Sequence, residues 1–441
     1  MNSRAFVAAQ RPSTAAPLVR LNPVDRLVLL TDRELHRRGT PGFTCQIHVR
    51  FDGRLNLQEL REAIAAAAAR WPLLTARLVK HPDWGWSPTR EATCRLQETS
   101  LASDREDDLA LAATRLLGEP LDITREAPVR FVVQHAANGN DVLTMQYSHV
   151  LMDGHGGIGL MRELLGCAPP AATGSVSTQS RFGPASSTDG RPWWRTLGDR
   201  RRPRAPRTVP VTYRLPPDQP LASRLLLRWL DADAHRRLRA RLARAGMTAN
   251  VSLAVVASGF RAVARRWQRP YTPDNVFETV LRFNARPHNA LHSYFQNQYG
   301  RATLSVRPSE LDDREALIRR LAAEFRGQFD ARRHEEFLRG AGLASRLARW
   351  APRFGRWVLR RSVTLTVGSF GEIAPLGRPA FGATMQGGFL HPVPFLQSPV
   401  IADVFPVGER LLMCLTSCAA AVTEEDARRL LDDWVEDLTV S

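Results

Sequence analysis

The sequence has little lysine and little cysteine, and it lacks any long hydrophobic run. Lys80 is the only lysine among 61 basic residues, so arginine carries almost all of the positive charge. The five cysteines are scattered without the spacing of a zinc site, and they predict neither a disulfide framework nor a metal site. No stretch approaches about 18 consecutive apolar residues, so no transmembrane helix is expected. The N-terminal apolar stretch is too short for a signal peptide, and the cytoplasm is the expected location.

The net charge of +17 favours acidic partners such as nucleic acid, anionic lipid, phosphorylated cofactors or an acidic protein. Because the excess is nearly all arginine, codon bias accounts for part of it. Nucleic-acid modules combine basic residues with a recognisable motif or with interleaved aromatic residues. The sequence contains neither a zinc finger nor an RNP-type signature, and a role in nucleic-acid binding is not expected.

The length of 441 residues predicts two domains rather than one core. Residues 168–208 are rich in alanine, proline, serine, threonine, glycine and arginine, without periodicity, and such a composition cannot bury much surface. We therefore predict a first domain at 1–175, a flexible linker at 176–208 and a second domain at 209–441. Both domains mix strand and helix patterns, which indicates an α/β class.

The stretch VLTMQYSHVLMDGHGG at 142–157 is the most informative part of the chain. Residues 142–149 are apolar and β-favouring and predict a buried strand. Asn138-Gly139 predicts a hairpin turn from a preceding strand at 128–134. Helical spacing begins at 158–165, so the glycines between strand and helix predict a tight turn with room for a substrate. His149 is thereby expected at the end of a strand, where a ligand can reach the ring.

His149, Asp153 and Gly154 form the pattern His-x-x-x-Asp-Gly. This motif resembles the HxxxDG signature of the chloramphenicol-acetyltransferase-like superfamily. The superfamily includes the condensation domains of nonribosomal peptide synthetases, plant BAHD acyltransferases, wax ester synthases and polyketide-associated acyltransferases. The motif lies at the end of a strand about a third of the way along the chain, which makes the resemblance more specific.

Other segments agree with the superfamily, and the resemblance extends over nearly the whole chain except the N-terminal arm and 168–208. These segments are the strand–turn–helix–Pro-Leu-Leu order of 43–78, Pro120-Leu121-Asp122, the strand leading into Asn284-Ala285-Arg286-Pro287, Phe295 to Gly300, and the strand before Gly368-Ser369-Phe370-Gly371. In Phe295 to Gly300, Gln296 stands where the superfamily more usually has glycine. The resemblance implies two chloramphenicol-acetyltransferase-like halves that form a V-shaped pseudo-dimer with a central channel.

The resemblance also implies acyl transfer, with His149 as the general base in the middle of the channel. A histidine with a near-neutral pKa can take the proton of an acceptor at physiological pH. The donor is expected to be a phosphopantetheine-linked thioester, either acyl-CoA or an acyl carrier protein. The acceptor is a hydroxyl or, as a second choice, an amine. We expect no permanently bound cofactor, no acyl-enzyme nucleophile and a monomer.

The resemblance assigns further roles around the motif. The Asp153 carboxylate is expected to point away from the chemistry and to pair with Arg286. Asn297 is expected to be structural and to bridge the two halves. Ser369 is a candidate oxyanion or substrate contact. His155 is a candidate substrate contact, with an exposed loop histidine as the alternative.

Two points leave other functions open. Ser148 replaces the first histidine of the HHxxxDG pattern of condensation domains, which argues against peptide-bond formation. The basic helical segment 310–361 has two interpretations. It is either a solvent-exposed arginine face, or a surface that binds an acidic carrier protein or makes a peripheral membrane contact. The alternative function is a non-catalytic, condensation-like protein that binds a carrier protein or another partner.

Overall fold

The computed structural model describes residues 18–80, 82–89, 93–167, 208–215, 219–244, 246, 251–284, 286, 294–331, 340–341, 362–394 and 397–440. The N-terminal arm to residue 17, all but the last residue of the predicted linker, and residues 332–339 and 342–361 of the predicted basic segment lie outside the described residues. The proposed boundaries between the domains therefore stay predictions. No helix in the described ranges combines the length and the apolar character needed to cross a bilayer.

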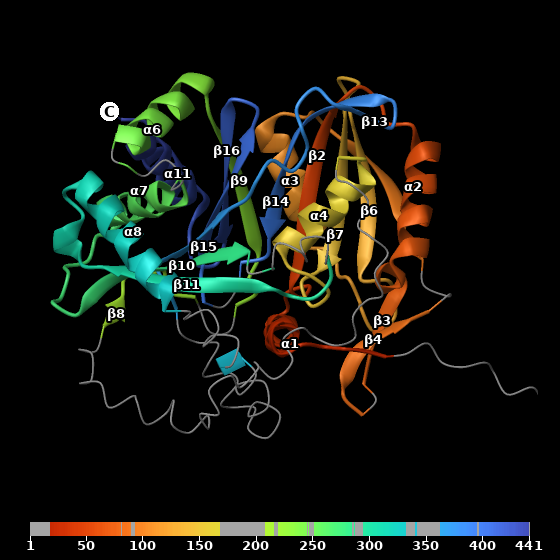
Figure 1. Cartoon of the computed structure of the whole chain (residues 1–441), viewed down its shortest axis with the longest axis horizontal. Coiled ribbons are helices and arrows are strands. Elements are labelled where there is room, and N and C mark those ends of the chain that lie inside the picture. Colours follow the sequence, from red (N-terminus) through yellow and green to blue (C-terminus); the bar gives the residue numbers. More distant parts are fainter. Residues whose placement is uncertain are drawn as a thin grey trace, which may run out of the picture.

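A six-stranded sheet forms the centre of one half, in the order β13-β14-β2-β7-β6-β5 (Figure 1). Its strands are β2 (Thr44–Asp52), β5 (Leu96–Leu101), β6 (Val129–Ala136), β7 (Asp141–Ser148), β13 (Pro379–Ala380) and β14 (Ala383–Pro392). The helices of this half are α2 (Leu57–Arg70), α3 (Glu106–Leu117) and α4 (Gly154–Leu164). The predicted hairpin is present, because β6 and β7 pair antiparallel around the turn at Gly139, whose φ is +90°.

The other half has a seven-stranded sheet in the order β11-β10-β12-β15-β16-β9, with β8 beside β10. Its strands are β8 (Val209–Pro210), β9 (Ser223–Leu230), β10 (Asn275–Asn284), β11 (Tyr299–Val306), β12 (Leu365–Ser369), β15 (Val400–Val407) and β16 (Arg410–Cys418). In the part of this half that the structure describes, the helices with assigned bounds are α6 (Ala232–Arg244), α7 (Val251–Arg266), α8 (Arg314–Asp330) and α11 (Glu424–Thr439). α7 packs against α8, α11 and β12, so these helices cover one face of the sheet.

The two halves share a strand. β14 comes from the C-terminal part of the chain, yet it pairs antiparallel with β2, with His391 opposite Gln46. Figure 1 shows β14 between the two groups of elements. Segment 379–392 thus completes the first sheet, and α3 packs against both β2 and β9. The halves are therefore interlocked rather than joined by one linker.

Two hydrophobic cores follow from the alternation of side chains along the strands. On β15, Val400, Ala402 and Val404 belong to the core under α7 and α11, whereas Phe405 belongs to the core of the first half. Asp403 shares the parity of Phe405 and is 1% exposed. The face of the second sheet that looks toward the first half therefore carries a buried carboxyl group.

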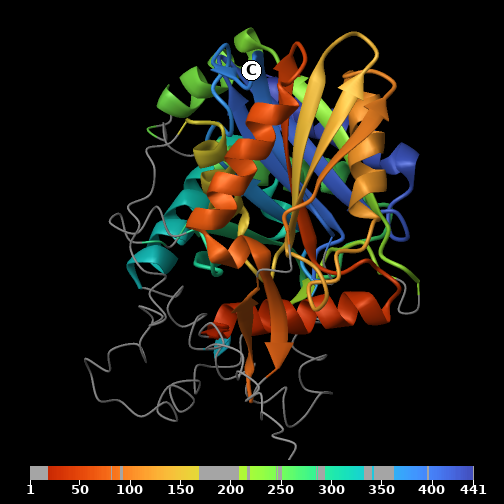
Figure 2. The ribbon, with the colours of Figure 1, turned by 90° about the vertical axis from the view of Figure 1, so that its right-hand side faces the viewer.

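A small sheet of β1 (Val19–Arg20), β4 (Trp84–Pro88) and β3 (Ala76–Lys80) lies beside α1 (Pro23–Arg37). Figure 2 shows α1 running across one end of the molecule, below the strands of both halves. α1 begins with a capping box, in which the side chain of Asn22 accepts from the backbone of Asp25 and the reverse contact is also made. The Asp25 carboxylate also accepts from Asn297, whose amide donates to the carbonyl of His149, so the first turn of α1 lies near the motif.

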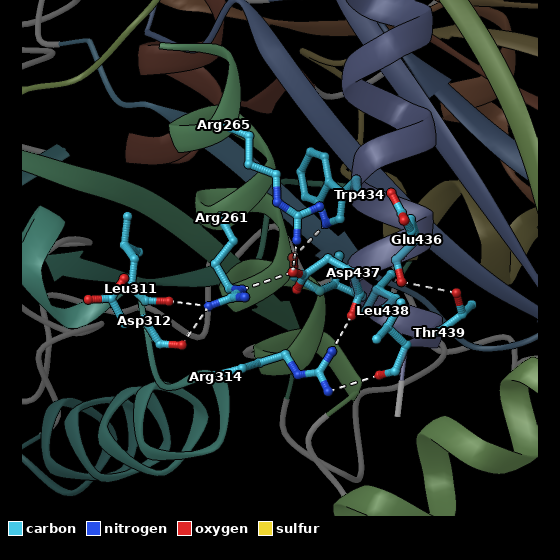
Figure 3. Close-up of polar contacts among 12 residues, drawn as sticks. Arg261, Arg265, Leu311, Asp312, Arg314, Trp434, Glu436, Asp437, Leu438 and Thr439 are labelled. Carbon is cyan, nitrogen blue, oxygen red and sulfur yellow. Dashed lines mark hydrogen bonds and ion pairs between the residues drawn. The ribbon is translucent and has the colours of Figure 1, made fainter.

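Arginines hold the C-terminal end of α11 (Figure 3). The buried Asp437 carboxylate accepts from Arg261 Nε at 2.9 Å and from Arg265 Nη2 at 2.8 Å. Arg314 donates to the carbonyl oxygens of Asp437 and Val440, which lack helical partners at the helix end. Part of the arginine content of this chain is therefore structural.

Candidate active site

His149 follows the last residue of β7, at the start of the turn that leads into α4. Its backbone N–H donates to the carbonyl of Phe43 at 2.8 Å, next to β2. Its carbonyl accepts from Asn297 Nδ2 at 2.8 Å. Both backbone polar groups of His149 are thus fixed by distant parts of the chain, so the position from which the ring projects is well defined.

The ring of His149 is buried, with 5% of the residue exposed. It packs against the ring of Phe43, with 4.5 Å between centroids. Burial lowers the pKa of His149 to about 4, because the imidazolium would lose its hydration, whereas Asn297 acts in the opposite direction. The imidazole is therefore unprotonated at neutral pH. Its pKa lies well below the near-neutral value expected from the sequence, because the ring is not at an open strand end.

A cavity of about 400 Å³ lies beside α1, with Asp32 and Arg33 among its lining residues. His149 is not among them. The Asp32 carboxylate accepts from the backbone N–H of Phe43 at 2.7 Å, and the ring of Phe43 covers that of His149. Phe43 thus connects the cavity wall to the histidine. The central channel that the resemblance implies stays a prediction.

The carboxylate of Asp153 is buried and fully engaged. It forms an ion pair with Arg286 at 2.9 Å, and it accepts from the backbone N–H groups of Gly156 and Gln298 at 2.8 Å each. Burial alone would raise the pKa of Asp153, but Arg286 and these donors outweigh it and lower the pKa. The predicted Asp153–Arg286 pair is present, and it joins the motif loop to the segment that follows β10.

Asp153 is also the N-cap of α4, which begins at Gly154 rather than at the predicted residue 158. The expected glycine-rich turn is the first turn of this helix, because the carboxylate satisfies the N–H of Gly156 and lies at the positive end of the helix dipole. His155 consequently lies in a helix and is half-buried, not in an exposed loop. Its ring is 5.0 Å from that of Phe370, and burial lowers its pKa.

Gly156 allows the carbonyl of Tyr294 to approach α4. A methyl group built at Gly156 would overlap that carbonyl oxygen, whereas a methyl group at Gly154 would meet only side-chain ends, at 3.1 Å from Leu390 and from Phe370. We expect Gly156→Ala to lower the free energy of unfolding by about 1–3 kcal/mol, because backbone must move. Gly154→Ala, the matched control, should cost about 1 kcal/mol or less. Urea denaturation of both variants measures the difference, and equal losses would contradict this packing.

Asn297 joins three parts of the chain, as expected for a structural residue that bridges the halves. Besides the His149 carbonyl, it donates to the Asp25 carboxylate from its backbone N and from Nδ2, each at 2.8 Å. The preceding residue, Gln296, has φ of +73° and donates its backbone N–H to the carbonyl of Leu151 at 2.8 Å. This left-handed conformation explains why glycine is the more usual residue there.

Ser369 ends β12 and is half-buried, opposite Val404 of β15. The residue that reaches the motif is the next one, Phe370, whose ring lies beside His155 and stacks on Phe405 at 5.5 Å. The role of Ser369 as a substrate contact stays a prediction. Within the described ranges, no group of three or more His, Cys, Asp or Glu side chains could hold a metal ion.

Sequence reasoning missed three residues of this region: Asp25, Phe43 and Asp403. Burial raises the pKa of Asp403 to about 6, and Arg282 of β10 acts against that rise. The positive charge of Arg282 also disfavours the protonated form of His149 and so lowers its pKa. None of these residues belongs to a local motif. Phe43 contacts His149, Asp25 contacts Asn297, and Asp403 interacts with Arg282, so the fold brings them to this region from segments far apart in the sequence.

No family model matches the sequence, and no curated protein matches it. Solved structures share its fold at low identity. The first condensation domain of the calcium-dependent antibiotic synthetase, in complex with a substrate analogue, is 16% identical, with a TM-score of 0.68 over 96% of each chain. A variant of the starter condensation domain of rhizomide synthetase, in complex with C8-CoA, is 13% identical, with a TM-score of 0.66 over 96% of this chain and 95% of that chain.

A further match comes from the complex of the X-domain and OxyB from teicoplanin biosynthesis, at 17% identity and a TM-score of 0.57, covering 100% of this chain and 95% of that chain. The TM-scores and coverages demonstrate a shared architecture, and identities this low support the fold alone. The chain therefore has the mixed α/β condensation-domain fold, with two chloramphenicol-acetyltransferase-like halves, and its His149, Asp153 and Arg286 lie where those halves meet.

Proposed function

We propose that this protein is an acyltransferase that moves an acyl group from a phosphopantetheine-linked thioester to a hydroxyl acceptor, with an amine as the second choice. The observation that carries the proposal is an unprotonated His149 held through both backbone groups at the junction of the two halves of a condensation-domain fold. Such a group suits general-base catalysis, and no covalent acyl-enzyme is needed.

In this reaction, neutral His149 takes the proton of the acceptor hydroxyl as its oxygen attacks the thioester carbonyl carbon. The tetrahedral intermediate then expels the thiolate, and the imidazolium returns the proton to sulfur. The products are an ester and the free thiol, and the enzyme is unchanged. The low pKa of His149 makes the imidazolium a strong acid, which favours the second proton transfer over the first.

Two observations support the choice of donor. A condensation domain of the same fold has been solved in complex with C8-CoA. The net charge of +17 suits both the phosphates of CoA and an acidic carrier protein. The proposal covers both donors, because the phosphopantetheine arm is common to them.

The assay is the release of free thiol from octanoyl-CoA and from an octanoyl carrier protein, with and without a panel of alcohols and amines. We expect release to depend on an acceptor and to be faster with alcohols. The complete absence of acceptor-dependent release from either donor would refute the proposal.

A second candidate is a non-catalytic protein of this fold that binds a carrier protein or another partner. The burial of His149 behind Phe43 favours it, since a base must contact its substrate. Stable binding of a carrier protein, measured by titration calorimetry, without any thiol release would support this candidate instead.

A further inference from the structure

Three segments of the chain converge on the amide of Asn297. The backbone of His149 comes from the end of β7, Asp25 comes from the first turn of α1, and Asn297 itself precedes β11. Asn297 is completely buried, and Asp25 is 1% exposed. Burying polar groups this deeply costs free energy unless they form hydrogen bonds, so the hydrogen bonds that these groups make restrict their positions strongly.

The orientation of the Asn297 amide is determined by its neighbours. Its Nδ2 group has two hydrogens, and they go to Asp25 Oδ1 and to the carbonyl oxygen of His149, each at 2.8 Å. Both partners are acceptors, so the amide oxygen cannot take the place of the nitrogen. In the described part of the chain, Asn297 Oδ1 has no hydrogen-bond partner.

Asp25 is held independently of Asn297. Its carboxylate accepts from the backbone N–H of Asn22 at 2.9 Å, and its own N–H donates to the side chain of Asn22 at 2.8 Å. This capping box would be complete without Asn297. The two additional bonds from Asn297 link the buried carboxyl of Asp25 to the carbonyl of His149 through this single residue. Burial raises the pKa of Asp25 to about 7.

We propose that Asp25 and Asn297 are positioning residues for His149, in which Asp25 locks the Asn297 amide and the amide holds the peptide from which the imidazole projects. The inference rests on the proposed function, in which His149 is the base. A shift of the reacting groups by about 1 Å can lower the rate about 100-fold, because proton transfer needs hydrogen-bond contact with the acceptor.

The test follows the ring of His149 directly, by ¹³C–¹H NMR of the eleven histidines between pH 3 and pH 8. The His149 signal is identified by its loss in His149→Gln. In Asn297→Ala and in Asp25→Ala we expect the His149 signal to move, and its titration midpoint to fall, since Asn297 raises the pKa of His149 against the larger effect of burial.

Asp25→Asn is the conservative variant, because its Oδ1 can still accept from Asn297 while only the contact with Asn22 is lost. Its His149 signal should stay close to that of the wild type, and this variant keeps the test valid if Asp25→Ala does not fold. Asp313→Ala is the matched control: it removes the N-cap of α8, which accepts from Ala316 at 2.9 Å, far from the motif. It should lower Tm without moving the His149 signal.

Turnover gives the second readout. We expect Asn297→Ala to lower kcat about 10- to 100-fold with KM within about 3-fold, and Asp25→Asn to lower kcat less than about 5-fold. An unchanged His149 titration in Asn297→Ala overturns the positioning role whether or not the wild type is active. If the titration of His149 is displaced in Asn297→Ala but the wild type releases no thiol, the positioning role is supported and only the proposed function is refuted.

Discussion

Replacing His149 by alanine is expected to lower kcat about 10²–10⁴-fold, which is the usual contribution of a positioned general base. The protein should remain folded, because within the described residues the ring Nδ1 has no hydrogen-bond partner that the substitution would leave unsatisfied. The backbone contacts to Phe43 and Asn297 do not depend on the side chain. Thiol release in the presence of a saturating acceptor measures the loss, and circular dichroism verifies the fold.

His155→Ala is the matched control for this substitution. His155 lies close to His149 in the sequence, in the first turn of α4. Its pKa is also lowered by burial, and its ring packs on Phe370 rather than on Phe43. We expect this variant to change KM by less than about 10-fold and to keep kcat within about 10-fold of the wild type. A His149→Ala variant that turns over at the wild-type rate would refute the general-base mechanism.

The pH dependence follows from the lowered pKa of His149. A base acts in its unprotonated form, and burial brings the pKa to about 4, so the fraction available is nearly constant at neutral pH. We expect the acid limb of kcat near pH 4 rather than near 6.5. An acid limb centred between pH 6 and 7 would instead indicate that the ring is hydrated when substrate is bound.

The sequence predicted elements best where periodicity and end signals agreed. The strands predicted at 128–134 and 142–149, with a hairpin turn between them, correspond to β6 and β7 within one or two residues at each end. β5, β14 and β15 were not predicted. Their residues pair with β6, β2 and β16, and these pairings depend on the sheet rather than on local propensity. The entry of β14 into the first sheet is equally a long-range property.

The candidate site was predictable where a motif fixed both partners. The Asp153–Arg286 pair follows from two positions that match the superfamily pattern, and Gln296, which departs from that pattern, has a positive φ. The helix start at Gly154 was missed because three glycines suggest a turn. The side chain of Asp153 caps the helix, and this cap stabilises a helical first turn despite the glycines. Phe43 was missed because contacts across the fold leave no trace in a local pattern.

Breaking the Asp153–Arg286 pair should give the largest loss of stability. The two side chains are only 4% and 2% exposed, so removal of either partner leaves a buried charge without its counter-ion. We expect Asp153→Ala to lower the free energy of unfolding by about 3–5 kcal/mol, and the yield of folded protein to fall with it. Denaturant unfolding at neutral pH measures this loss. A decrease below about 1 kcal/mol would contradict the role of the pair.

Asp153→Asn separates the ion pair from the helix cap, because asparagine also caps helices well and can still accept from the N–H of Gly156. Asp153→Asn should still show most of the decrease in unfolding free energy expected for Asp153→Ala, because Arg286 stays charged and has lost its counter-ion. Adding Arg286→Ala to Asp153→Asn should lower the stability by less than the sum of the two single changes, with a coupling of about 0.5–3 kcal/mol.

The pKa of Asp153 is lowered on folding, so the stabilisation from its carboxylate is complete at neutral pH and disappears as the pH falls through the folded pKa. The stability difference between the wild type and Asp153→Asn should therefore shrink in acid, and a difference that grew instead would show that the carboxylate is not the stabilising form.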